Sequence, residues 1–143
     1  MRTIKQILDR KSRRIASIKP DRTVFEALQY MAEKNIGSII VMEKDKYLGV
    51  LTERDYARKV ILMNRSSKTI LVNEIMSVDL PFLIESDNIE RCMSIMSELN
   101  IRYLPVLEGE NLVGIISVKD VVDEMLIQQK EIIDDLTNYI TRS

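Results

Sequence analysis

The sequence predicts a mixed α/β (α+β) fold in which two β-α-β-β-α repeats pack about a pseudo-two-fold axis. The first observation is that GVLTERD at residues 49–55 returns as GIISVKD at 114–120, an offset of 65 residues that also aligns 24–61 with 89–126 without a gap. The second is that each copy shows helical spacing and then two short apolar runs. Neither copy has enough apolar face to fold comfortably alone, so a packed pair is favoured over a solenoid.

An amphipathic helix is predicted near the start of each copy. Apolar residues recur at i, i+3, i+4 and i+7 from Val24 in the first copy and from Ile89 in the second. Thr23, three residues before Glu26, fits a capping box that starts the first of these helices. Short extended pieces lead into the two copies at residues 15–18 and 81–84.

A strand hairpin and a second helix follow in each copy. The predicted strands cover residues 38–42, 47–51, 103–107 and 112–116. The second helices start after Thr52 and Ser117. Residues 63–76 form a linker whose end resembles the start of the chain, so a short lead-in helix is expected before each copy. The predicted repeats are therefore residues 1–68 and residues 69–143.

The C-terminal segment 119–139 is predicted to be one long helix with at most one break. It carries more apolar residues than the outer helix of a small domain needs, namely Val122, Met125, Leu126, Ile132, Ile133 and Leu136. This excess indicates a subunit interface. Folding of the helix back onto its own domain is an equally weighted alternative.

Composition excludes several classes of protein. The 143 residues can bury the core of one compact domain, and a net charge of −1 argues against a general nucleic-acid binder. A single cysteine cannot form an internal disulfide, which favours a reducing, cytoplasmic location. The absence of histidine removes the commonest metal ligand and the commonest general base. Cys92 is expected to pack in the core. No signal peptide and no membrane-spanning run are predicted.

Two polar segments follow the predicted strands at equivalent positions. Thr52 with Asp55, and Ser117 with Asp120, fit the pattern of a hydroxyl that caps a helix and an acid in its first turn. One such site alone would be interpreted as a helix cap. Because the whole pattern of glycine, two apolar residues, hydroxyl and aspartate occurs twice, a ligand site is also predicted.

A phosphorylated nucleoside fits the chemistry of these segments. A helix N-terminus with free N–H groups and a hydroxyl can hold a phosphate, and Arg54 and Lys119 are near enough to add positive charge. A carboxylate would repel phosphate. Asp55 and Asp120 are therefore predicted to accept hydrogen bonds from the two hydroxyls of a ribose.

An adenine base would need an apolar slot with free backbone groups. The candidate lining residues are Ile18, Pro20, Ile36, Gly37, Ser38, Leu83, Arg102, Tyr103, Leu104 and Pro105. Pro105 removes a backbone donor, so its strand is expected at a sheet edge or against a ligand. Gly49 and Gly114 lie inside strands, where a missing side chain lets a ligand or another backbone approach. For each apolar residue, core packing is the competing interpretation.

These segments resemble the CBS-domain family, in the stand-alone tandem form called a Bateman module. The resemblance is carried by NIGSIIVME and YLGVLTERDYARKV in the first copy and by CMSIMSELNIRYLPVLEGENLVGIISVKDVV in the second. It implies a homodimeric regulatory module that binds AMP, ADP or ATP, and in some members NAD(H) or S-adenosylmethionine. Asp55 and Asp120 would hold ribose, Thr52 and Ser117 would contact ribose or phosphate, and Arg102 would be a phosphate or inter-site contact.

Three functions are open on the sequence. A sensor of cellular energy or redox state would signal through a conformational change to a separate, unidentified protein. A structural homodimer would carry vestigial pockets and make its contacts through the C-terminal helix. An enzyme ranks last, because no positioned base, metal site or catalytic cofactor is evident.

The two sites are expected to differ in charge. Arg58 and Lys59 follow the first aspartate, whereas Asp123 and Glu124 follow the second. The first site is therefore predicted to favour more phosphate charge, although a solvated helix face would explain the basic residues equally well.

Overall fold

The computed structural model describes residues 2–11 and 15–142. Its strands form one sheet of order β1-β2-β3-β5-β4, with bounds β1 Ser17–Ile18, β2 Ser38–Glu43, β3 Lys46–Thr52, β4 Tyr103–Glu108 and β5 Asn111–Ser117. The helices are α1 Ile4–Arg10, α2 Val24–Lys34, α3 Glu53–Tyr56, α4 Val72–Ile75, α5 Ile89–Leu99 and α6 Val118–Arg142, and a π-helical turn η1, Ala57–Ile61, continues α3. The predicted mixed fold is confirmed, and strands β2 to β5 lie within one residue of their predicted ends.

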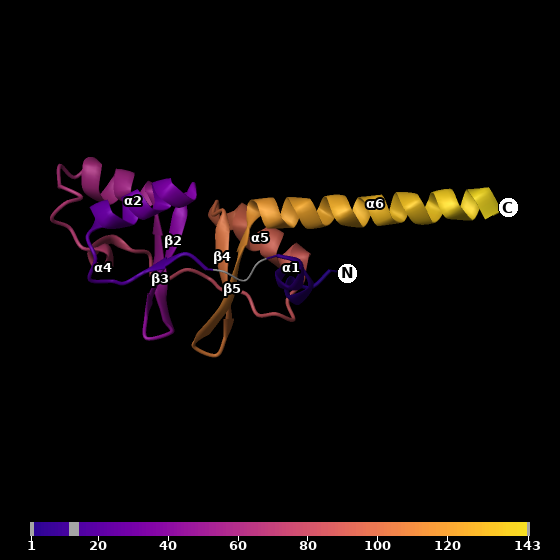
Figure 1. Cartoon of the computed structure of the whole chain (residues 1–143), viewed down its shortest axis with the longest axis horizontal. Coiled ribbons are helices and arrows are strands. Elements are labelled where there is room, and N and C mark those ends of the chain that lie inside the picture. The colour runs from indigo at the N-terminus through magenta and orange to yellow at the C-terminus, as the bar shows by residue number, and fades with distance from the viewer. Residues whose placement is uncertain (1, 12–14, 143) are drawn as a thin grey trace.

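The repeat seen in the sequence is also a structural repeat. Each copy contributes one antiparallel hairpin, and the two hairpins meet where Lys46 pairs with Asn111 (Figure 1). The extended piece before each copy pairs in parallel with the first hairpin strand, Ile18 with Val41 in one copy and Leu83 with Val106 in the other. Strand β4 lies at the sheet edge, as the proline in its sequence predicted.

The helices α2 and α5 begin and end at equivalent residues. Thr23 Oγ1 accepts the backbone N–H of Glu26 at 3.1 Å, which confirms the predicted cap, and Asn88 caps α5 in the same way. Asn35 and Asn100 end the two helices in the left-handed conformation, with φ of 54° and 52°. Asparagine tolerates this conformation better than most residues. The chain therefore turns at the same point in each copy to enter β2 or β4.

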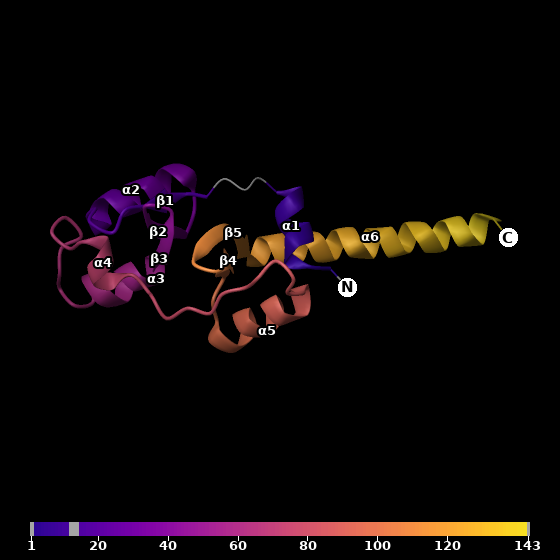
Figure 2. The same cartoon turned by 90° about the horizontal axis from the view of Figure 1, so that it is seen from below.

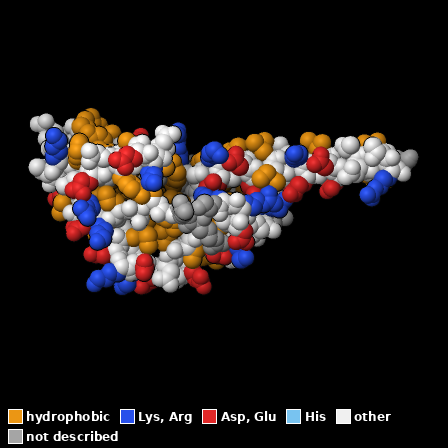
Figure 3. Space-filling model, in the orientation of Figure 1, with side chains coloured by type: hydrophobic (Ala, Val, Ile, Leu, Met, Phe, Trp, Pro, Cys, Tyr) orange, Lys and Arg blue, Asp and Glu red, His pale blue; other side chains and the backbone are white. Residues whose placement is uncertain are grey.

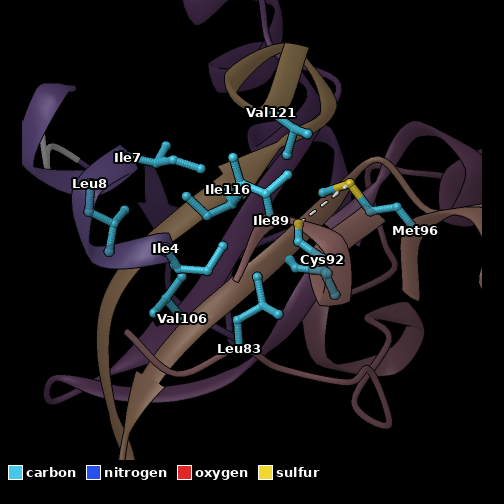
Figure 4. Close-up of a cluster of buried hydrophobic side chains, with 11 residues drawn as sticks. Ile4, Ile7, Leu8, Leu83, Ile89, Cys92, Met96, Val106, Ile116 and Val121 are labelled. Atoms are coloured by element: carbon cyan, nitrogen blue, oxygen red, sulfur yellow. Dashed lines mark hydrogen bonds between the residues drawn. The ribbon is translucent and has the colours of Figure 1, made fainter. Parts of the chain in front are cut away.

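Each lead-in helix packs on the other repeat. Helix α1 lies beside the second repeat, and its Ile4, Ile7 and Leu8 are buried there in one cluster with Ile89 and Cys92 (Figures 1 and 4). Helix α4 instead contributes to the core of the first repeat. This exchange explains how two small units share enough apolar surface to be stable. The repeat boundary after residue 68 stays a prediction, and the cores exchange their lead-in helices across it.

The two strand glycines allow neighbouring protein segments to approach closely. A Cβ on Gly49 would lie 2.6 Å from the backbone oxygen of Ser77, and a Cβ on Gly114 would lie 2.6 Å from Cδ2 of Leu8. Both distances are far below van der Waals contact. Of the alternatives that the sequence left open, close approach of another protein segment accounts for both glycines: the backbone that follows α4 lies against Gly49, and a side chain of α1 lies against Gly114.

Cys92 is fully buried, as predicted, with its Sγ 3.9 Å from Sδ of Met96 (Figure 4). Burial is the main reason that the pKa of this thiol is raised to about 11, with smaller contributions from Asp120 and Asp87. The thiol therefore stays protonated at neutral pH.

Helix α6 runs unbroken for 25 residues and extends well past the rest of the chain in both views (Figures 1 and 2). The predicted single helix is confirmed, but the alternative in which its distal part folds back onto its own domain is wrong. Across residues 2–11 and 15–142, no helix combines the length and apolar character required for a membrane span.

Candidate functional site

Two clefts lie between the repeats, and each takes residues from both. The first, here called the Thr52 cleft, has a volume of about 480 Å³ and runs from Thr52 and Asp55 to residues 100–103 of the second repeat. The second, the Ser117 cleft, has a volume of about 800 Å³ and runs from Ser117 to the segment around Ile36 in the first repeat. The 65-residue repeat thus places one candidate site on each side of the contact between the copies.

The carboxylate of Asp55 both caps its helix and lines the Thr52 cleft. Its Oδ2 accepts the N–H of Thr52 at 3.0 Å, while its own N–H donates to Thr52 Oγ1 at 3.0 Å. Ser77 Oγ donates to Oδ1 at 3.1 Å, and Lys59 Nζ lies 3.2 Å from Oδ1. Asp55 is 7% exposed. The predicted helix cap is confirmed, and a capping role does not remove this side chain from the cleft wall.

The carboxylate of Asp120 is covered by a lysine. Its Oδ2 accepts the N–H of Ser117 at 2.9 Å and a second bond from Lys11 Nζ at 2.6 Å. Lys11 also donates to the carbonyl of Ile115 at 2.9 Å. Lys11 lines the Ser117 cleft, whereas Asp120 is not among its lining residues. The ammonium group therefore occupies one of the positions from which a ribose hydroxyl could donate to this aspartate, at Oδ2.

The pKa of Asp120 reflects these contacts. Partial burial acts to raise the pKa, but hydrogen bonds from Lys11 and Ser117 outweigh it and hold the pKa below its usual value. Because the folded pKa lies below the unfolded value of about 3.9, ionised Asp120 stabilises the fold above that pH. This contribution is lost as the pH falls through the folded pKa.

Replacing Lys11 with methionine is expected to lower the free energy of unfolding by about 1 to 2 kcal/mol at neutral pH, since a charged hydrogen bond to a half-buried acid is lost. Urea unfolding of both proteins at about pH 7 and about pH 3 measures the difference, which should shrink in acid as Asp120 is protonated. Lys5→Met, on the exposed side of α1, the helix that Lys11 follows, is the control and should change little. An equal difference at both pH values would show that Lys11 acts through packing instead.

The helix N-termini are less open to phosphate than predicted. The N–H of Glu53 donates to the carbonyl of Gly37 at 3.1 Å, and the N–H of Val118 donates to the carbonyl of Arg102 at 3.0 Å. The third amide of each helix is held by its capping hydroxyl. Two of the first three backbone amides at each helix N-terminus are therefore already hydrogen-bonded. The prediction of a phosphate site formed by free N–H groups is corrected accordingly. Phosphate binding would depend mainly on side chains.

The Thr52 cleft supplies such side chains. Arg54, Arg58, Lys59 and Arg102 line it together with the acids Glu53 and Asp55. Arg54 Nη1 donates to the carbonyl of Asn100 at 3.2 Å and so joins the two repeats. Within the part of the chain that the structure describes, no acid pairs with Arg58 or Arg102. These two guanidinium groups remain available for an anion.

The Ser117 cleft offers less free positive charge. Its basic lining residues are Lys11, Arg102 and Lys119, but Lys11 is paired with Asp120 and Lys119 is paired with Asp123 at 2.7 Å. Arg102 and Tyr103 line both clefts and form the wall between them. No three His, Cys, Asp or Glu side chains within the described ranges are grouped so that they could hold a metal ion.

The structure brings most of the predicted site residues to the clefts. The Thr52 cleft holds Gly37, Thr52, Arg54, Asp55, Arg102 and Tyr103, and the Ser117 cleft holds Ile36, Ser38, Arg102, Tyr103, Ser117 and Lys119. Six predicted residues line neither cleft, namely Asp120, Ile18, Pro20, Leu83, Leu104 and Pro105. Leu104 enters the core where Tyr103 enters the clefts, because successive strand residues point to opposite faces, and Leu83 lies in the same core cluster. Ile18 packs against the core of the first repeat, and Pro20 and Pro105 are buried. Core packing, the competing interpretation, accounts for the apolar residues among the six.

Sequence analysis missed Lys11, Ser77 and Asn100. The 65-residue offset could have suggested Ser77, because it aligns with Ser12 at the same distance after the lead-in helix. Ser12 lies outside the described residues. For Lys11, the sequence contains no signal, because its contact with Asp120 depends on the exchange of the lead-in helices.

Comparison with known proteins gives consistent similarities. The model of the family described as CBS domain matches residues 4–62 and 72–127. The chain is 34% identical over 125 residues to the mitochondrial CBS domain-containing protein CBSX3 of Arabidopsis thaliana, with 84% of this chain and 61% of that protein covered. The chain thus spans less than two thirds of that relative.

Two solved structures extend the comparison. A protein with CBS domains from Burkholderia ambifaria superposes with a TM-score of 0.84 at 41% identity, covering 90% of this chain and 96% of that one. The CBS domain pair of protein MJ0100, crystallised with 5-methylthioadenosine and S-adenosyl-L-methionine, has a TM-score of 0.74 at 24% identity and covers 90% and 98% of the two chains. At that identity the second similarity concerns the fold alone.

Proposed function

The chain belongs to the CBS-domain family as a tandem pair, and from this premise we propose that it is a regulatory module that binds adenosine nucleotides between its repeats. The observation that carries the proposal is the Thr52 cleft, where the buried carboxylate of Asp55 stands beside unpaired guanidinium groups. A ribose and its phosphates need this combination of acceptor and positive charge. The CBS domain pair of MJ0100, which shares the fold, is an example of such a pair that holds adenosine-containing ligands.

In the Thr52 cleft, the ribose would lie against Asp55 and the phosphates against Arg58 and Arg102. The carboxylate oxygens of Asp55 are shared with Ser77 and Lys59, and Lys59 Nζ also donates to the carbonyl of Ile75 at 2.9 Å, so a ribose hydroxyl would have to displace one of these two partners. Because the free basic groups of this cleft outnumber those of the Ser117 cleft, we expect it to prefer ATP or ADP over AMP. NAD(H) and S-adenosylmethionine are further ligands in this proposal.

Binding would be transmitted through the contact between the repeats. A nucleotide in the Thr52 cleft would touch α3 of the first repeat and residues 100–103 of the second, so it would favour one packing of the copies. In this proposal the chain acts as a homodimer without catalytic activity of its own, and a separate protein reads the change as a signal of energy or redox state.

A structural homodimer with vestigial pockets is the second candidate. It is favoured by the observation that both aspartates have a complete role as helix caps without any ligand. In that case the clefts would be remnants of the fold, and the exposed helix α6 would carry the functional contacts.

Thermal and chemical unfolding of the purified chain with each nucleotide separates the two candidates. A ligand of the folded state at 100 times its Kd should stabilise the protein by about 2.7 kcal/mol. The panel should contain AMP, ADP, ATP, NAD(H) and S-adenosylmethionine, with inorganic triphosphate as the control for charge alone. Stabilisation by an adenosine compound but not by triphosphate supports the sensor, and no stabilisation by any compound supports the structural homodimer.

A further inference from the structure

The distal part of α6 carries a stripe of apolar side chains in solvent. The match to the family model ends at residue 127, so residues 128–142 of this helix lie beyond it. Most members of the stripe are large and more than half exposed: Leu126 59%, Ile132 53%, Ile133 61%, Leu136 57%, Tyr139 77% and Ile140 69%. Exposed apolar patches of this kind mark interaction surfaces.

The stripe follows a seven-residue repeat. Its central positions alternate by four and three residues and are Val122, Leu126, Gln129, Ile133, Leu136 and Ile140. Met125, Ile132 and Tyr139 recur beside them at intervals of seven. This spacing is the pattern by which one α-helix packs along another. In each seven-residue repeat, a third apolar position beside the two central ones widens the contact surface.

The opposite side of α6 is already used within the chain. Glu124 is buried and pairs with Arg2 at 3.3 Å and with Arg10 at 3.7 Å, and Glu131 pairs with the same two arginines. These ion pairs with residues in and beside α1 fix the rotation of α6 about its axis. The apolar stripe is thereby held away from α1, and Figure 3 shows apolar side chains along one edge of the projecting helix with acidic side chains below it.

We propose that the stripe binds the same stripe of a second copy of this chain, helix against helix. A standard interface takes about 800 Å² from each partner, and the large apolar side chains of the stripe, most of them more than half exposed, are of the kind that forms the core of such an interface. Gln129 is its polar member and carries both a donor and an acceptor, so it can pair with Gln129 of the second copy across a two-fold axis. Asp134 and Asp135, on the other faces of the distal helix, disfavour an anionic membrane as the occupant.

This inference rests on the homodimer in the proposed function and assigns it a surface outside the family match. Apart from Val122, which lines the Ser117 cleft, the stripe is separate from the two clefts. Nucleotide-induced stabilisation, measured on the same variants, therefore distinguishes failure of the helix contact from failure of ligand binding.

Ile133→Glu and Asn138→Glu form a matched pair for the test. Both positions are exposed on α6, but Asn138 lies on the side opposite the stripe. Sedimentation velocity over a range of protein concentrations should show self-association weakened at least tenfold by Ile133→Glu and unchanged by Asn138→Glu. Identical association of the native chain and both variants, or binding of a monomeric native chain to anionic vesicles through this stripe, would overturn the proposal.

Cross-linking gives a second readout that does not depend on disrupting the contact. In Gln129→Cys, the two new thiols should lie within disulfide range across the axis, so mild oxidation should yield covalent dimers. Asn138→Cys should yield none, and the native chain, whose Cys92 is buried, is the baseline. Equal cross-linking at residues 129 and 138, or none at either, contradicts a helix-to-helix contact through this stripe.

Discussion

Gly49→Ala is expected to destabilise the fold by about 2 to 3 kcal/mol, because overpacking and lost hydrogen bonds add together at this position. The new methyl group would lie 2.6 Å from the carbonyl oxygen of Ser77. That segment is bound to β3 by two backbone hydrogen bonds, Val50 N–H to Ser77 O at 3.0 Å and Ser77 N–H to Val50 O at 2.9 Å. Relief of the clash requires the two segments to separate. Urea unfolding of the native and variant chains measures the cost.

Gly37→Ala is the control for the general effect of adding a methyl group to a glycine. A Cβ at Gly37 would have its nearest neighbour, the Glu53 side chain, at 3.9 Å, which is ordinary contact. The free energy of unfolding should change by less than about 1 kcal/mol. If both alanine variants lose the same stability, the close approach of Ser77 does not explain the glycine at position 49.

Asp55→Asn is expected to weaken ATP binding by roughly 10- to 100-fold, the loss that follows when a charged hydrogen-bond acceptor becomes a neutral one. Asparagine has nearly the same shape and also caps helices well, so it can keep the bond from the N–H of Thr52. Stability should fall by only about 1 to 2 kcal/mol, the cost of the lost ion pair with Lys59 Nζ at 3.2 Å, while affinity falls further. Titration calorimetry with ATP measures the affinity, and urea unfolding checks the fold.

Asp120→Asn is the matched variant in the other repeat. We expect it to leave the tighter ATP site unchanged, because that site is assigned to the Thr52 cleft. If the site that remains in Asp120→Asn prefers adenosine to ATP, the assignment of phosphate preference to the basic cleft is wrong. Equal losses in both variants would indicate two equivalent sites, against the charge difference between the clefts.

The hairpins show what the sequence could predict. A short apolar run next to a polar turn defines each strand locally, so the 65-residue repeat provided two independent estimates of every boundary. Helix starts at Thr23 and Thr52 were also predictable, because a hydroxyl three residues before an acid satisfies the first amides of a helix.

The partner of each lead-in helix could not be predicted in the same way. Helices α1 and α4 both present short apolar faces, and nothing local to Ile4 or Val72 specifies which of two similar cores will bury it. The positions of Lys11 and Ser77 follow from that choice, so the polar environment of each aspartate was also hidden. The types of residue that line the clefts could be predicted from the sequence. Which of these residues already form ion pairs or hydrogen bonds with one another could not.

The wall between the clefts has a consequence for how they would fill. Arg102 borders both, and one guanidinium cannot neutralise a phosphate on each side at full strength. If an anion is bound in one cleft, Arg102 attracts an anion in the other cleft less strongly. By thermodynamic reciprocity, each ligand then lowers the binding affinity of the other by the same factor. Such antagonism would spread saturation over a wider concentration range than two independent sites would give, so the protein would respond gradually to its ligand.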